Sequence, residues 1–112
     1  MKKRDYKLFI KDIVDAMDHI EEFAGDMALE ELEADEKTSS AVIRKFEIIG
    51  EATKNLPEDI KKDYPNIPWR EMAGMRDKLI HFYFGIKYEL VWRTVKDVIP
   101  QIRPSLIEIY KK

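Results

Sequence analysis

Residues 6–24 read YKLFIKDIVDAMDHIEEFA. Apolar side chains recur in this stretch at spacings of three and four, and charged side chains take the positions between them, which is the pattern of an amphipathic helix. The apolar positions are Tyr6, Phe9, Ile10, Ile13, Met17, Ile20 and Ala24. Gly25 follows directly and favours the end of the helix. The stretch therefore predicts a long helix with one buried face.

The same periodicity continues along the chain, which only four glycines and five prolines interrupt. Further helices are expected over residues 35–55, 68–85, 89–98 and 102–110. Residues 58–64 could form a short helix, and residues 26–36 are expected to be a connection or a short solvated turn of helix. We expect Pro100 to end the helix over residues 89–98 and Pro104 to lie in the first turn of the last helix. The inward positions of residues 89–98 are expected to be Leu90, Val91, Thr94, Val95 and Val98. The pattern predicts an all-α fold, a compact bundle of four to five helices.

Length and composition limit the classes of function that need consideration. A chain of 112 residues has the size of one domain, so we expect a single helical domain over residues 1–112. The absence of cysteine excludes disulfides, thiolate metal sites and a cysteine nucleophile. The two histidines, His19 and His81, do not lie at metal-ligand spacing, and no glycine-rich phosphate loop is present, so we expect no metal and no cofactor. No apolar run approaches the roughly 20 residues that span a bilayer, which favours a cytoplasmic protein without membrane contact.

Charge is unevenly distributed along the chain. The formal net charge is −2, yet residues 1–36 carry 5 basic and 12 acidic side chains and residues 70–112 carry 9 basic and 5 acidic ones. An acidic chain gains no general attraction to phosphate. A nucleic-acid site would therefore have to be local and built from the basic last part.

Residues 68–85 read PWREMAGMRDKLIHFYFG and combine apolar bulk with clustered polar groups. On one continuous helix, Arg76 and Tyr83 would lie within about 20° of one another, and Asp77 and His81 about 40° apart. Asp77 could then orient His81. Because the two pairs point in different directions, the length of arginine or a second copy of the helix would have to bring all four groups together.

These side chains suit the cleavage of an RNA phosphodiester by the neighbouring 2′-hydroxyl. An imidazole transfers a proton near neutral pH, while a guanidinium holds the phosphate and offsets its growing charge, with no need of a metal. The alternative is structural: His81 as a surface or capped core residue, with Arg76 and Asp77 ion-paired to neighbouring helices. Residue types and spacing alone leave both interpretations open.

The arrangement Arg76-x-x-x-x-His81-x-Tyr83 resembles the signature of HEPN domains, and its ending is that of HepT-like ribonuclease toxins. Other segments resemble the same family over nearly the whole chain: Ile49-Gly50-Glu51-Ala52, Pro68-Trp69-Arg70, Gly74-Met75-Arg76, and Tyr83-Phe84-Gly85 followed by Trp92. The resemblance implies a homodimeric bundle in which the motifs of two protomers face each other across a cleft. It also implies metal-independent RNA cleavage, with Arg76 as phosphate clamp and His81 as proton-transfer residue.

The family's partner is an MntA-like nucleotidyltransferase antitoxin, which neutralises the toxin by transferring AMP to the motif tyrosine. In this chain that tyrosine is Tyr83, and the acidic first third is a candidate surface for the antitoxin. Many relatives have asparagine after the motif arginine, where this chain has Asp77. That carboxylate either lowers activity or holds His81 in one tautomer and raises its pKa. Glu47 and Glu51 are candidates to face the cleft, the alternative being a solvated or ion-paired surface.

Two other interpretations differ in class from a ribonuclease toxin. A non-catalytic helical accessory subunit of a minimal nucleotidyltransferase would bind nucleotide or RNA at the motif without cutting it. A plain oligomerisation domain would leave the polar cluster of residues 68–85 unexplained. The accessory subunit is therefore the main alternative to a ribonuclease toxin.

Overall fold

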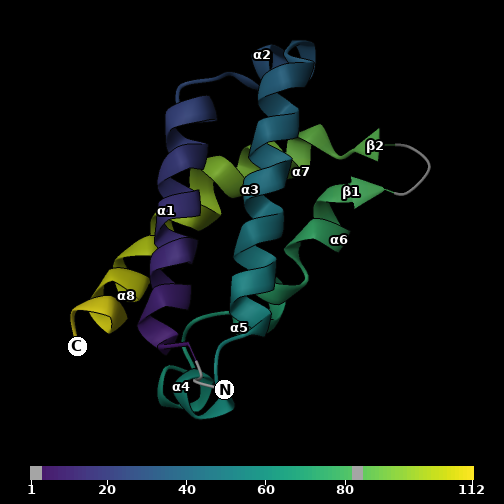
Figure 1. The fold of residues 1–112 in the computed structure, drawn as a ribbon. Helices are drawn as coiled ribbons and strands as arrows, with labels where there is room; N and C mark the ends of the chain where they lie inside the picture. The colour runs from purple at the N-terminus through teal and green to yellow at the C-terminus, as the bar shows by residue number, and fades with distance from the viewer. Residues whose placement is uncertain (1–3, 82–84) are drawn as a thin grey trace.

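The computed structural model describes residues 4–81, with only the backbone of His81, and residues 85–112. The fold is all-α, as the sequence predicts (Figure 1). Its helices are α1 (Tyr6–Ala24), α2 (Leu29–Ala34), α3 (Glu36–Lys54), α4 (Glu58–Asp63), α5 (Trp69–Ala73), α6 (Met75–Leu79), α7 (Tyr88–Arg93), the π-helical turn η1 (Thr94–Val98) and α8 (Ile99–Lys111). Two strands of two residues each, β1 (Ile80–His81) and β2 (Gly85–Ile86), complete the described elements. None of the helices in these residues is long and apolar enough to cross a membrane.

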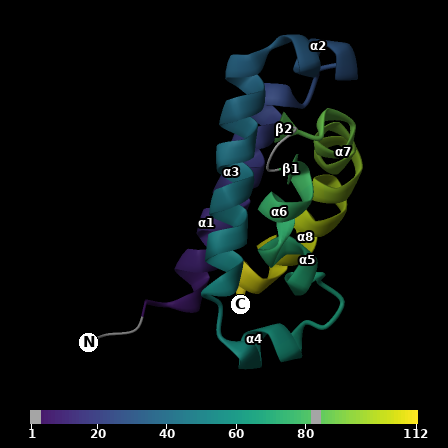
Figure 2. The same ribbon diagram turned by 90° about the vertical axis from the view of Figure 1, so that its right-hand side faces the viewer.

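The bundle is built on the antiparallel pair α1 and α3 (Figure 1). Helix α8 packs on α1, and the α5–α6 pair packs on α3, as the view turned by 90° also shows (Figure 2). The apolar stripes predicted for α1 and α3 meet in the core, where Ile13, Phe46 and Ile49 are completely buried. The apolar stripe of each of these two helices is thus buried against the other helix.

Two cap residues fix where the long helices begin. The Asp5 carboxylate accepts a hydrogen bond from the backbone N–H of Lys7 at the start of α1. The Asp35 carboxylate accepts bonds from the backbone N–H of Thr38 at 2.9 Å and from its hydroxyl at 2.7 Å at the start of α3. These bonds satisfy N–H groups that have no partner within a helix.

Gly50 allows α5 to approach α3 closely. A Cβ atom at this position would lie 3.1 Å from the backbone oxygen of Ala73, closer than nearly all contacts of a real Cβ. Because Ala73 ends α5 and Gly74 leads directly into α6, this approach also sets α6 beside α3. The close approach at Gly50 therefore places Arg76, on α6, next to α3.

The prediction of one helix over residues 68–85 is wrong. Helix α5 ends before Gly74, α6 ends at Leu79, and Ile80 has extended backbone with φ −118° and ψ 126°. Ile80 then pairs with Ile86, and His81 with Gly85, in an antiparallel register. Isoleucine and the aromatic residues that follow it in the sequence favour strands, and Gly85 at φ 80° serves a hairpin instead of a helix end.

The predicted break at Pro100 is also wrong, because α7, η1 and α8 follow one another without interruption. Pro100 lies in the first turn of α8. Pro104 was predicted in the first turn of the last helix but lies inside α8, because α8 begins earlier than the sequence suggested. Val91, Thr94 and Val95 are buried as expected, but Leu90 is 39% and Val98 37% exposed. Val98 is the last residue of the π-helical turn, whose hydrogen bonds span five residues, so the α-helical spacing used for the prediction does not apply to it.

Candidate functional site

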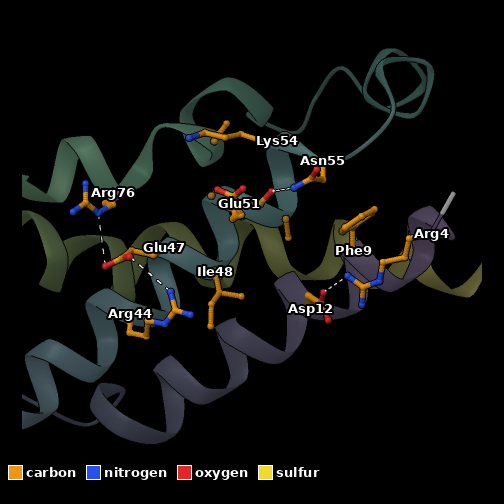
Figure 3. A pocket seen from close by; sticks show the side chains of 13 residues that line it. Arg4, Phe9, Asp12, Arg44, Glu47, Ile48, Glu51, Lys54, Asn55 and Arg76 are labelled. Atoms are coloured by element: carbon orange, nitrogen blue, oxygen red, sulfur yellow. Dashed lines mark hydrogen bonds and ion pairs between the residues drawn. The ribbon is translucent and has the colours of Figure 1, made fainter. Parts of the chain in front are cut away.

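An open groove of about 440 Å³ lies between α3, the start of α1 and the α5–α6 pair (Figure 3). Its charged lining residues are Arg4, Asp12, Arg44, Glu47, Glu51, Lys54 and Arg76. Glu47 and Glu51 thus share a groove with the motif arginine. The groove combines cations with carboxylates, so its ability to hold an anion depends on which of these charges are already paired.

Arg76 reaches the groove from α6 and keeps a 57% exposed side chain. Its Nε atom lies 3.7 Å from Oε1 of Glu47, and its Nη1 atom lies 4.0 Å from Oδ1 of Asp77. Both distances exceed the 2.7–3.2 Å of a hydrogen bond between nitrogen and oxygen. A guanidinium has five N–H donors, so these loose ion pairs leave Arg76 able to bind an anionic ligand.

Glu47 faces a second guanidinium from its own helix. Nη1 of Arg44 lies 3.8 Å from Oε2 of Glu47, and the Arg44 side chain is 68% exposed. Figure 3 shows Glu47 between Arg44 on one side and Arg76 on the other. Arg44 is not among the residues that the sequence motif indicates. The signal that could have found it is its position three residues before Glu47, which places both side chains on one face of a helix.

Arg4, at the other end of the groove, is held more firmly than Arg44 and Arg76. Nη1 of Arg4 lies 2.7 Å from Oδ2 of Asp12, and its guanidinium carbon lies 4.7 Å above the centre of the Phe9 ring. A short charge-assisted hydrogen bond and a cation–π contact hold the same group. Arg4 is therefore less available to a ligand than Arg44 or Arg76.

Asp77 lies on α6 beside Arg76, and its side chain is 85% exposed. The expectation that it orients His81 rested on a helical spacing of four residues. That spacing does not apply, because α6 ends at Leu79 and His81 lies in the extended strand β1. The orienting role of Asp77 stays a prediction without this geometric support.

The remaining motif residues fall at the limit of the described chain. The backbone of His81 pairs with Gly85, but its side chain lies outside what the structure describes, and so does Tyr83. The described residues place the motif arginine on the groove and the backbone of the motif histidine five residues further along the chain. Among the residues that the structure describes, no group of three or more histidine, aspartate and glutamate side chains is arranged to hold a metal ion.

Comparison with known proteins gives a consistent result. Residues 13–109 match the family model described as "Ribonuclease HepT-like". The chain is 50% identical over 109 residues to a "Probable ribonuclease HepT" of Thermococcus cleftensis, covering 97% of this chain and 99% of that protein. It is 49% identical over 111 residues to a putative RNase of Methanocaldococcus jannaschii, covering 99% and 92%. It is 38% identical over 104 residues to a putative RNase of Caldanaerobacter subterraneus, covering 93% of each. No solved structure matches the chain.

Proposed function

This chain belongs to the family of HepT-like ribonucleases, and on that premise we propose that it is a metal-independent endoribonuclease, the toxin of a type II toxin–antitoxin pair. The observation that carries the proposal is the guanidinium of Arg76. It is exposed on the groove, and its ion pairs with described residues are loose, at 3.7 and 4.0 Å. Such a group can exchange its carboxylate neighbours for a phosphate.

The proposed reaction is an internal transesterification of RNA. The 2′-oxygen loses its proton and attacks the adjacent phosphorus. The bond from phosphorus to the 5′-oxygen then breaks, and the leaving oxygen takes up a proton. The products are a 2′,3′-cyclic phosphate and a 5′-hydroxyl end. We assign proton transfer to His81, since imidazole exchanges protons near neutral pH, and charge compensation on the phosphate to Arg76.

A homodimer is part of the proposal. Arg76 and His81 lie in different elements of one protomer, α6 and β1. A two-fold axis would bring two copies of each residue to a shared cleft, because a symmetric interface presents the same surface from both protomers. Sedimentation of the purified protein tests this part, with a mass near twice the 13.3 kDa of one chain as the expected result.

Neutralisation is proposed to occur at Tyr83. An MntA-like nucleotidyltransferase partner would transfer AMP from ATP to its hydroxyl, with release of pyrophosphate and of the hydroxyl proton. This adds a bulky anionic group seven residues after Arg76 in the sequence. Such a group would attract the guanidinium and repel an RNA phosphate. The modification would thus engage the guanidinium of Arg76, the positive charge that the proposed reaction needs.

The alternative, a non-catalytic accessory subunit, is favoured by the carboxylates of the groove and by the net charge of −2. The deciding experiment is RNA cleavage by purified protein in a metal chelator, after mass spectrometry has shown that Tyr83 is unmodified. His81→Ala is expected to lower the rate by roughly 10²- to 10⁴-fold, the usual contribution of a proton-transfer residue. Arg76→Ala should lower it by roughly 10²- to 10³-fold.

His19→Ala is the matched control, because His19 is the other histidine of the chain and lies on α1. Its variant should cut RNA at the wild-type rate. Undiminished cutting by His81→Ala would overturn the catalytic assignment. If the unmodified wild type cuts none of a panel of transfer, messenger and ribosomal RNAs, the accessory subunit becomes the better description.

A further inference from the structure

Glu47 lies between two guanidinium groups on the wall of the groove (Figure 3). Its Oε1 atom faces Nε of Arg76 at 3.7 Å, and its Oε2 atom faces Nη1 of Arg44 at 3.8 Å. We propose that Arg44 and Arg76 together form a two-arginine phosphate site, and that Glu47 occupies in the free protein the place that an RNA phosphate takes in the complex. This inference rests on the proposed function for its ligand, a phosphodiester of RNA.

The contacts of Glu47 are those of a carboxylate that can be displaced. Several ion pairs outside the groove are much shorter, such as Lys11 with Asp15 and Arg103 with Asp18, both at 2.7 Å. Exposed ion pairs contribute little to stability even with good geometry, and those of Glu47 are too long to be hydrogen bonds. A phosphodiester also presents two anionic oxygens and suits the planar donor array of arginine.

Arg44 is the second arginine of the site because it shares an anion with Arg76. It projects from α3, whereas Arg76 projects from α6, so the two guanidiniums approach Glu47 from different elements. Arg4 also lines the groove but is engaged by Asp12 and by the Phe9 ring. Two arginines around one carboxylate provide more donors than that carboxylate can accept, and such a surplus is what phosphate binding requires.

Two further carboxylates lie near the two-arginine site. Glu51 lines the groove one turn after Glu47 on α3, and Asp77 lies 4.0 Å from Arg76 on α6. These carboxylates oppose RNA binding in every variant below, so they do not distinguish the variants from one another. Removing the positive charge of Arg44 should weaken RNA binding, and removing the negative charge of Glu47 should strengthen it. The opposite signs exclude a mere disturbance of the fold, which would weaken binding in both cases, and the size of each effect is compared with the same change of charge outside the groove.

The experiment measures binding of a single-stranded 2′-O-methyl RNA oligonucleotide by fluorescence anisotropy at several salt concentrations. The methyl group blocks the attacking oxygen, so binding is measured without cleavage. Arg44→Gln is expected to raise the Kd by roughly three- to tenfold and to reduce the slope of log K against log salt by about 0.7, the loss of one phosphate contact on a single strand. Glu47→Gln is expected to lower the Kd by roughly two- to fivefold.

Lys11→Gln and Asp15→Asn are the matched controls. They make the same changes of charge in an exposed ion pair of α1, and neither residue lines the groove. Their Kd values should stay within about twofold of the wild-type value, because salt weakens the effect of exposed charges that make no direct contact with the bound phosphate. Circular dichroism should show all four variants folded, since every substituted side chain is at least one-third exposed.

The outcomes separate this inference from the proposed function. If the wild type cuts unmodified RNA but Arg44→Gln binds as Lys11→Gln does, the two-arginine site is wrong and the ribonuclease stands. If Glu47→Gln binds no more tightly than Asp15→Asn, Glu47 does not occupy the phosphate position and the inference is overturned. If the wild type does not cut RNA but the two groove variants shift binding in opposite directions as expected, the site stands and the ribonuclease proposal fails.

Discussion

The indole N–H of Trp92 donates a 2.9 Å hydrogen bond to the backbone carbonyl of Met27, a residue 65 positions earlier in the chain. This bond joins α7 to the connection between α1 and α2. Trp92 is half-buried. Its ring packs against the core, while its N–H holds the connection before α2. Because α7 begins two residues after β2, the bond also anchors the chain that follows the hairpin.

Replacing Trp92 by phenylalanine tests the strength of this anchor. The variant keeps an aromatic ring but leaves the Met27 carbonyl without its donor, so the free energy of unfolding should fall by about 1 kcal/mol. Urea denaturation measures the change. Tyr110→Phe is the control, since Tyr110 is exposed and should tolerate the loss of its hydroxyl. Equal stability of the two variants would show that the bond with Met27 contributes nothing.

Gly50→Val tests the close approach of α5 to α3. A side chain at Gly50 meets the Ala73 backbone oxygen at 3.1 Å, and this oxygen can move only with α5. We expect a loss of about 1–3 kcal/mol in the free energy of unfolding, typical of an overpacked contact. Gly74→Ala is the control, because its Cβ would make an ordinary contact at 3.6 Å and should change stability by less than about 0.5 kcal/mol.

Asp77→Asn is expected to increase RNA cleavage by about two- to fivefold. The Asp77 carboxylate lies 4.0 Å from the Arg76 guanidinium and competes with a phosphate for it. Removing an exposed charge of this kind has an effect of at most about 1 kcal/mol, which sets the magnitude. Rates at several pH values measure the effect. A lower rate with a displaced pH profile would contradict this prediction and support the orienting role for Asp77 instead.

The Asp35 cap makes the stability of the folded state depend on pH. The backbone N–H and hydroxyl of Thr38 hold the pKa of the Asp35 carboxyl below its ordinary value of 3.8. The ionised cap therefore stabilises the folded state above that value, and this contribution is lost as pH falls through the lowered pKa.

Asp35→Asn keeps an acceptor at the start of α3 but cannot titrate. Its melting temperature should fall less than that of the wild type between about pH 4 and pH 2. Asp63→Asn removes a carboxylate at the exposed end of α4 and serves as the control. Identical pH profiles for Asp35→Asn and the wild type would show that this cap does not contribute to acid sensitivity.

The sequence determined the long helices and the family. The stripe from Ile10 to Ala24 and the stripe around Phe46 each repeat every three to four residues, a local property that backbone geometry converts directly into a buried helix face. The motif also indicated Arg76, and it lies on the groove. Glu47 and Glu51 line this groove too, whereas their place in a cleft between two protomers stays a prediction.

Only the tertiary structure decided how residues 68–85 divide and what Arg76 contacts. Ile80 begins a strand although apolar spacing suited a helix, because local propensities differ by small free energies that packing overrides. The contact of Arg76 with Glu47 joins α6 to α3 across a close approach at Gly50, a distance that no local pattern encodes. Periodicity therefore fixes which face of each helix is buried, whereas the pairing of charges across helices follows from how the buried faces pack together.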